Sequence, residues 1–189
     1  MSQTESYNNA LQEFVLAWGE MASAWGINKT MAQIHALLYA EDDPLDTDRI
    51  MDVLGISRGN ANMNIRNLMQ WGLVHKVHYS GDRKDYFTAE KDVWITAATI
   101  IRERHQREIE PIQSNLRKMM ANLEEGSVAN EKEENLQKRI KDTVKFLDMF
   151  EEFTQALLPF VKEKNVGTLK QLTKLAKMKN KLRPASEKK

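Results

Sequence analysis

The sequence LGISRGNANMNIRNLMQWGLVHKV, residues 54–77, contains a helical pattern with turn residues on both sides. Gly55 ends the helix before it, Ser57 can cap its N-terminus, and Gly72 stops it. Beyond Gly72, residues 73–79 place apolar side chains on one face at period two, which predicts a β-strand. This segment therefore predicts a turn, a helix and a strand in that order.

Three further helical patterns lie before this segment, and a second strand lies after it. Residues 7–25 repeat aromatic and aliphatic residues at steps of three and four. Polar residues suited to capping begin the next two patterns: Asn28 or Thr30, and Asp46 or Thr47. A turn at 80–84 precedes the strand predicted at 85–88. This order of elements is that of a winged helix–turn–helix, in which the helix after the glycine turn enters the major groove of DNA.

Two long amphipathic patterns follow, at residues 92–125 and about 131–164. Apolar residues in the second recur at strict four-three spacing, and Pro111 predicts a kink in the first. Helices this long expose more apolar area than a small monomer can cover. We therefore expect a homodimer in which the N- and C-terminal helices interlock between chains. The alternative is an intramolecular helical hairpin without a partner chain.

These patterns predict a mainly α fold with a small two-stranded β wing, built as a winged helix–turn–helix domain plus long dimerisation helices. The expected divisions are an N-terminal helix contributing to dimerisation (1–26), the winged helix–turn–helix domain (27–90), a long helical dimerisation region (91–166) and a basic C-terminal tail (167–189). The tail carries eight basic residues and one acidic residue. It would suit DNA phosphates or an anionic membrane surface, and a frayed, solvated end is the alternative.

The outward face of the helix after Ser57 is the expected reading surface. If Ala61, Ile65 and Leu68 are buried, the rotation of about 100° per residue turns Arg66 outward. We expect the DNA-binding residues to lie on this face and at the hairpin tip: Ser57, Arg58, Gly59, Asn60, Asn62, Met63, Arg66, Asn67, Arg83 and Lys84.

The composition of this helix supports contact with DNA. Asparagine costs a few tenths of a kcal/mol in a helix and glycine about 1 kcal/mol relative to alanine, so stability does not explain four asparagines and Gly59. Asparagine can pair with adenine and arginine with guanine through two hydrogen bonds, and Arg83 and Lys84 can reach phosphates or the minor groove. An ordinary solvated face is the alternative, and Asn64, turned partly inward, can instead bond to neighbouring backbone.

The composition and motifs of the chain argue against several other classes of protein. The chain has 189 residues, a net charge of +1 and no cysteine, so it has no disulfide, zinc–thiolate site or thiol nucleophile. We find no catalytic motif and no histidine pair placed to share a metal, so we expect no enzyme, cofactor or metal site. The longest apolar run, 94–101, is too short to span a membrane and no signal-peptide layout is present, so we expect a cytoplasmic protein. Residues 57–84 hold five basic residues and one acidic residue, which suits a polyanionic partner.

The segment 54–77, followed by GDRK (81–84) and YFTAE (86–90), resembles the GbsR branch of the MarR-like bacterial transcriptional regulators. In that branch Gly-Ile-Ser-Arg-Gly-Asn opens the recognition helix, Asn-Ile-Arg or Asn-Leu-Arg continues it, Trp-Gly ends it and Gly-Asp-Arg-Lys forms the wing tip. The resemblance implies a homodimer that binds a pseudo-palindromic operator, usually as a repressor, with half-sites about one helical turn apart. Some members govern uptake or synthesis of choline-derived osmoprotectants.

Effectors of MarR-like proteins typically bind between the dimerisation helices and the reading domain. Five aromatic residues could line such a pocket and would suit a quaternary ammonium ligand: Phe14, Trp18, Trp25, Tyr39 and Trp94. Ordinary core packing of these rings is the alternative.

Two other functions stay open: a winged-helix module that binds a polypeptide, and a scaffold or membrane-peripheral protein built on the long helices.

Overall fold

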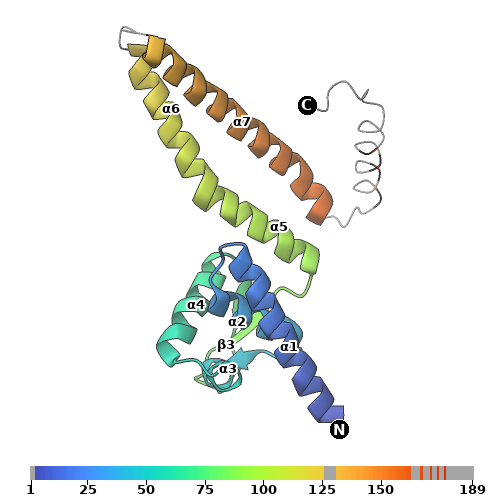
Figure 1. Cartoon of the computed structure of the whole chain (residues 1–189). Coiled ribbons are helices and arrows are strands. Elements are labelled where there is room, and N and C mark those ends of the chain that lie inside the picture. The colour runs from blue at the N-terminus through green and yellow to red at the C-terminus, as the bar shows by residue number, and fades with distance from the viewer. Residues whose placement is uncertain are drawn as a thin grey trace. The chain divides into compact units, whose positions relative to one another are not determined.

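The computed structural model describes residues 3–125 and 131–162 and four isolated positions, 167, 171, 174 and 177. Residues 126–130, between the two long helical patterns, and most of the basic tail predicted at 167–189 lie outside the described residues. The chain divides into two compact units, Met1–Thr99 and Ile100–Lys189, each with its own packing (Figure 1).

The first unit follows the element order predicted from the sequence. Its elements are α1 (Gln3–Ala24), α2 (Lys29–Ala40), β1 (Leu45–Asp46), α3 (Thr47–Leu54), α4 (Arg58–Gln70), β2 (Val74–Val77), β3 (Tyr86–Ala89) and the start of α5 (Val93–Arg104). Side-chain oxygens cap three of the helices: Asn28 accepts from the Met31 N–H at 2.9 Å, Asp46 from Arg49 at 2.8 Å and Ser57 from Asn60 at 3.3 Å. Gly55 and Gly72 end α3 and α4 with φ of 62° and 69°, a conformation that favours glycine.

The core of the first unit is centred on α2. Its most buried side chains come from α2, α3, α4 and the sheet: Ile34, Leu37, Leu38, Ile50, Ile65, Leu68 and Val74. Helix α1 lies along α2 and approaches it closely at Gly19, where a Cβ atom would stand 2.7 Å from Cγ of Gln33. The apolar faces of short helices thus meet around one central helix, which is how amphipathic helices gain stability in a small domain.

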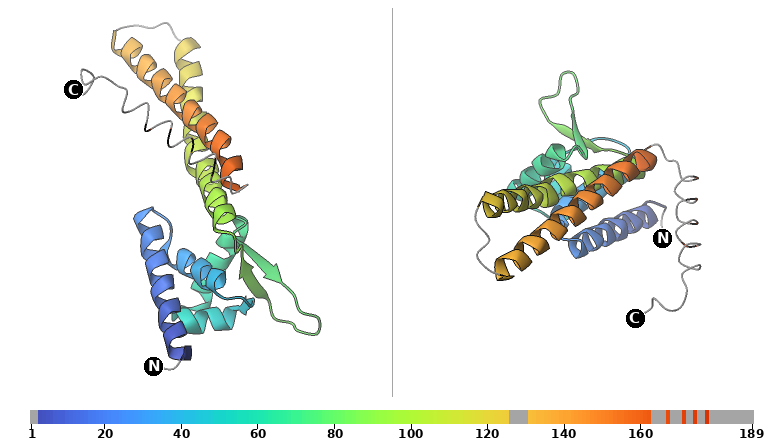
Figure 2. Two further views of the ribbon diagram at one scale, coloured as in Figure 1. Left: turned by 90° about the vertical axis from the view of Figure 1, so that its right-hand side faces the viewer. Right: turned by 90° about the horizontal axis from the view of Figure 1, so that it is seen from above.

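The sheet is antiparallel with strand order β1-β3-β2. Strands β2 and β3 form the predicted hairpin, with Val74 opposite Ala89 and Val77 opposite Tyr86. Figure 2 shows this hairpin, the wing, projecting from the helices of its unit. The mainly α fold with a small β wing is confirmed, but the sheet has three strands rather than two. Strand β1 was missed because two residues cannot show an alternating pattern; its pairing with β3 is a tertiary contact.

The second unit contains the end of α5, the π-helical segment η1 (His105–Ile109), α6 (Glu110–Glu125) and α7 (Glu131–Lys162). The helix predicted over 92–125 is therefore interrupted, with a wide π-helical turn directly before Pro111 instead of a simple kink. Proline has no N–H to donate and its ring crowds the carbonyl one turn earlier, so a regular α-helical turn is disfavoured there. The N–H of Glu110 instead bonds to the carbonyl of His105.

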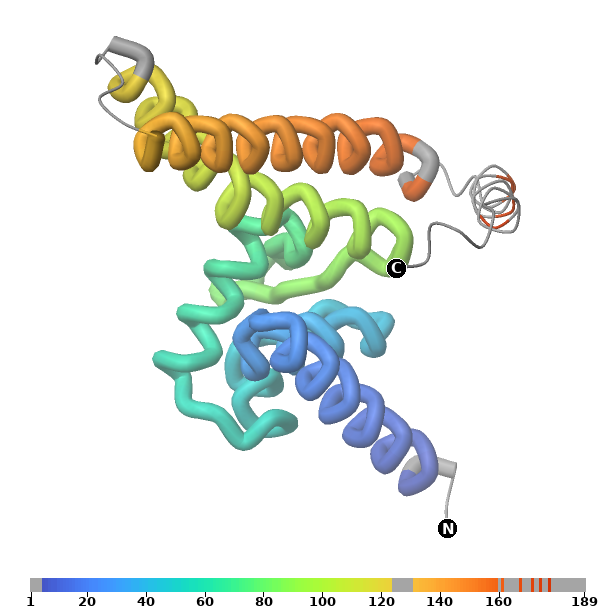
Figure 3. The backbone as a smooth tube through the Cα atoms, turned by 45° about the horizontal axis from the view of Figure 1, so that its top comes forward, coloured from blue at the N-terminus to red at the C-terminus, as the bar shows by residue number. Residues whose placement is uncertain are grey.

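Helices α6 and α7 run side by side (Figure 3). Polar side chains join them: Gln113 Nε2 lies 3.1 Å and Arg117 Nη2 2.7 Å from Asp148 Oδ1, and Gln137 donates to the carbonyl of Leu123 at 3.0 Å. Apolar side chains spaced three and four residues apart on α7 are exposed within the described structure: Phe146, Met149, Phe150 and Phe153. The described residues of a single chain leave this stripe, which we call the α7 stripe, uncovered.

Candidate nucleic-acid interface

Helix α4 is half-buried in the way its sequence predicts. Ala61, Ile65 and Leu68 are at most 2% exposed, so one face anchors the helix. The residues predicted to contact DNA lie on the other side: Ser57, Arg58, Gly59, Met63 and Arg66 are exposed, and Asn60, Asn62 and Asn67 are partly exposed. A Cβ atom at Gly59 would meet nothing within 4 Å, so the space over this backbone is open to a large partner.

Asn64 is an internal residue that orients a neighbour. It is 1% exposed, and its Nδ2 donates to the carbonyl of Asn60 at 2.9 Å and to Oδ1 of Asn60 at 2.7 Å. The local-bonding alternative predicted for Asn64 is therefore what the structure has. The bond from Asn64 orients the amide of Asn60 and leaves one lone pair of Oδ1 for a contact with adenine.

The wing tip is held by Asp82. Its carboxylate accepts the backbone N–H of Lys84 at 2.9 Å and the hydroxyl of Tyr86 at 2.8 Å. These bonds, the one from the Lys84 backbone first, hold the pKa of Asp82 below its usual value. Tyr86 also meets Tyr79 edge-on, with ring centroids 4.9 Å apart. The tip that carries Arg83 is thus braced on both sides of the turn.

The four cations predicted to meet DNA differ in their surroundings. Arg66 and Arg83 are exposed and form no ion pair with a described residue. Arg58 pairs with Asp48, and Lys84 Nζ lies 2.5 Å from Asp46 Oδ2. The hydrogen bond from Lys84, together with the N–H of Arg49, lowers the pKa of Asp46. The sequence did not indicate these partners, because Asp46 is 38 residues from Lys84.

Only part of the predicted effector pocket comes together. Ring centroids of Phe14 and Trp18 are 5.6 Å apart, and Tyr39 lies 6.3 Å from each. Trp25 and Trp94 are 60% and 37% exposed and contribute no ring contact to this cluster. Trp25 directly follows α1 and Trp94 is the second residue of α5, so neither joins the cluster formed by α1 and α2.

His35 of α2 also belongs to this aromatic cluster. The His35 ring stacks on Trp18 and Tyr39 at 6.2 and 6.1 Å and is 2% exposed. Burial, and then the charge of Lys91, lowers the pKa of His35 to about 4. Lys91 itself donates to the carbonyls of Leu38 and Tyr39 at the end of α2, at 2.6 and 3.2 Å.

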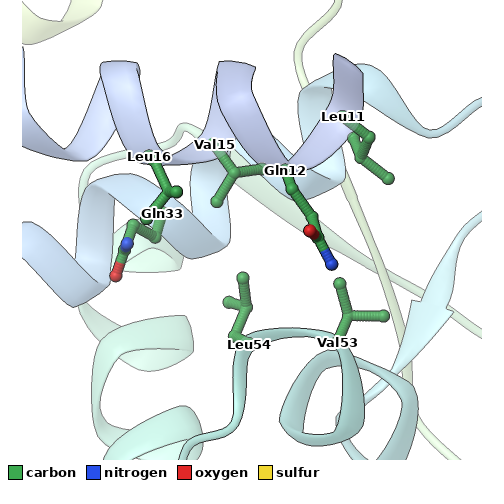
Figure 4. Close-up of a pocket in the computed structure, with 7 residues that line it drawn as sticks. All are labelled: Leu11, Gln12, Val15, Leu16, Gln33, Val53 and Leu54. Carbon is green, nitrogen blue, oxygen red and sulfur yellow. The ribbon is translucent and has the colours of Figure 1, made fainter. Parts of the chain in front are cut away.

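A small pocket lies between α1, α2 and the end of α3 (Figure 4). Its volume is about 170 Å³, and none of the five predicted aromatic residues lines it. The lining residues are Leu11, Gln12, Val15, Leu16, Gln33, Val53 and Leu54. Among the described residues we find no group of three or more acidic or histidine side chains able to hold a metal, and no helix long and apolar enough to cross a membrane.

The helices α2 to α4 and the β2–β3 hairpin define a winged helix–turn–helix. No protein-family model matches the chain. It is 19% identical over 144 residues to the "Putative HTH-type transcriptional regulator YvaV" of Bacillus subtilis (strain 168), covering 75% of this chain and 81% of that protein. A crystal structure of a transcriptional regulator superposes with a TM-score of 0.63 at 17% identity, covering 82% of this chain and 99% of that one. This second likeness establishes the fold.

Proposed function

We propose that this chain is a sequence-specific DNA-binding transcriptional regulator of the GbsR/MarR-like type, and not an enzyme. In this proposal it acts as a homodimeric repressor on a pseudo-palindromic operator and is released by a small-molecule effector. The observation that carries the proposal is the outer face of α4, where exposed Arg66 stands beside Asn62 and Asn67. The YvaV protein is named as a regulator of the same helix–turn–helix class, which agrees with this function.

The parts of the interface divide into base-reading and backbone-binding groups. Arg66 lies near the middle of α4, where a helix seated in the major groove meets base edges. Ser57, Arg58 and Gly59 begin the helix, and their backbone N–H groups suit a phosphate. Arg83 at the braced wing tip would meet the neighbouring backbone or the minor groove. This division assigns sequence preference to α4 and affinity to both groups.

The homodimer is supported by the α7 stripe. Its four large apolar side chains are exposed in a single chain, and a second copy of the chain that covered them would bury area of the kind found in dimer interfaces. We assign dimerisation to residues 1–26 and 91–166, which flank the reading domain 27–90. A dimer would present two α4 helices to successive half-sites of one operator.

The effector site is assigned to the cluster of Phe14, Trp18 and Tyr39. Aromatic ring faces attract a quaternary ammonium ion, and these three rings are partly exposed. The resemblance to GbsR-type regulators points to choline-derived compounds. Adding choline to the DNA complex should release the DNA, and Trp18→Ala should abolish that release. Release of equal extent from the Trp18→Ala variant would remove the cluster from the proposal.

The function is tested by selecting from a pool of random-sequence duplexes with the full chain. We expect enrichment of a two-fold symmetric motif. We also expect affinity to fall steeply between about 50 and about 200 mM salt, because phosphate contacts release counterions. Binding to a polypeptide would lack that salt dependence. If the chain binds no duplex at the low salt concentration, the DNA assignment is wrong and the protein-interaction module takes its place.

A further inference from the structure

Two cations of the proposed interface are held by carboxylates from the start of α3. Arg58 pairs with Asp48, and Lys84 Nζ lies 2.5 Å from Asp46 Oδ2 and 3.6 Å from Asp48 Oδ2. The four side chains line one polar pocket of about 270 Å³ between α3, α4 and the wing. Asp85 also lines this pocket and pairs with Lys76, with its Oδ2 2.7 Å from Lys76 Nζ. Asp46 and Asp48 therefore balance the charges of Arg58 and Lys84 at this point of the interface.

The backbone fixes the position of Asp46. Strand β1 pairs with β3 so that Asp46 stands opposite Tyr86, two residues after Lys84. The other oxygen of Asp46 caps α3 through the N–H of Arg49 at 2.8 Å, and only 14% of the side chain is exposed. The carboxylate cannot swing away from Lys84 without losing this cap, so its placement beside the wing belongs to the fold.

DNA phosphates would compete with these carboxylates. The phosphate backbone follows the edge of the groove that a recognition helix occupies, so it would pass the start of α4 and the wing. A phosphate that binds Arg58 or Lys84 must displace an aspartate or share the cation with it, and it is also repelled by the nearby negative charge. A phosphate that binds Arg66 or Arg83 displaces no carboxylate, because no described carboxylate pairs with these two residues.

We infer that Asp46 and Asp48 limit the affinity of this chain for the DNA backbone by holding Arg58 and Lys84 in the free protein. This inference rests on the proposed function and adds two residues to it that act against binding. Two cations are held back from phosphates until DNA is engaged through the remaining contacts. Removing the carboxylates should therefore strengthen binding to duplex DNA of any sequence.

The test measures binding of the full chain to a labelled pool of random-sequence duplexes at several salt concentrations. Asp46→Asn keeps a side chain that caps helices well, and Asp48→Asn changes a half-exposed side chain. Each variant should bind the pool about two- to fivefold more tightly, and the double variant about tenfold, with a steeper salt dependence. Asp52→Asn is the matched control, because Asp52 is exposed on the same helix and loses the same charge. Its effect should stay below about twofold.

A variant that lacks Arg58 separates the effect of the ion pair from the effect of the protein's overall charge. In an Arg58→Gln chain, the effect of Asp48→Asn should be reduced, because one of the two cations beside Asp48 is absent and only Lys84 remains. A chain that binds the pool but whose Asp46→Asn and Asp48→Asn variants gain no more than Asp52→Asn overturns the inference and leaves the proposed function standing. An undiminished gain in the Arg58→Gln background also overturns it. Failure of the unaltered chain to bind any duplex overturns the proposed function, and the inference with it.

Discussion

The two units of this chain differ in how far their apolar side chains are buried. In the first unit, Ile34, Leu37 and Leu38 of α2 are at most 1% exposed. In the second, Phe146 and Phe153 of α7 are 58% and 61% exposed, and the contacts described between α6 and α7 are largely polar. A buried core supplies stability within one chain, whereas an exposed apolar stripe favours association. In the proposed function, the first unit holds the reading surface and the second recruits a second copy.

The largest expected effect compares the two units directly. Leu37→Ala should destabilise the first unit by about 2 to 5 kcal/mol, because it leaves a cavity in a closed core. Phe153→Ala, at concentrations where the chain is monomeric, should cost less than about 1 kcal/mol. Denaturant unfolding followed by circular dichroism measures both changes. Equal losses would mean that the α7 stripe is already covered within a single chain.

The pH dependence of stability should be concentrated in the first unit. His35 has a pKa of about 4 when folded and about 6.5 when unfolded, so the unfolded chain binds more protons between these values. Stability should therefore be full above pH 6.5 and fall by about 3 kcal/mol as the pH drops to 4. Unfolding curves across this range provide the measurement. His35→Phe should flatten the dependence and the exposed His75→Asn should not, and a dependence unaltered by His35→Phe would contradict the assignment to this residue.

Arg66→Ala tests whether the surface of the first unit reads bases without supporting the core. We expect DNA affinity to fall by about 1 to 3 kcal/mol and base preference to relax at the contacted position, because a two-bond contact to guanine is lost. The unfolding free energy should change by less than about 0.5 kcal/mol, since the side chain is exposed. Selection from random duplexes measures the base preference, fluorescence anisotropy the affinity, and denaturant unfolding the free energy of unfolding. Arg139→Ala of the second unit is the control. An unchanged selected motif would remove Arg66 from base reading.

Arg83→Ala should have the smallest effect of the four. We expect a loss of affinity of at most about 1 kcal/mol, a salt slope lower by about 1, and no change in the selected motif. The brace made by Asp82 and Tyr86 does not use the Arg83 side chain, so the wing should keep its shape. Affinity measured over a range of salt concentrations distinguishes this from base reading. A relaxed motif would instead place the wing tip against base edges.

Local sequence patterns predicted most of the first unit. Ser57 caps α4, Gly72 ends it, and Ala61 and Ile65 anchor it, and each of these follows from rules that act within one or two helical turns. The outward face of α4 was predictable for the same reason, since it is the complement of the buried face.

The features that escaped prediction depend on residues far apart in the chain. Strand β1 exists because it meets β3, and Asp46 reaches Lys84 only through that pairing. The surroundings of His35 likewise combine α1, α2 and Lys91. The resemblance to MarR-like regulators suggested a pocket lined by five aromatic residues, but it cannot say that Trp25 and Trp94 lie apart from the ring cluster. Contacts of this kind require the folded arrangement.

The π-helical turn at His105–Ile109 directly precedes α6 and affects which of its side chains face α7. Because a π-helical turn holds about one residue more than an α-helical turn, one residue fewer in this segment would restore a regular turn with little change of phase. One residue fewer at the start of α6, between Glu110 and Ile112, would instead rotate each later side chain by about 100° about the helix axis. Gln113 and Arg117 would point away from Asp148, and the bonds that join α6 to α7 would be lost. A one-residue deletion here would therefore be more disruptive than most substitutions, since it changes the facing surface of a whole helix while leaving its composition almost intact.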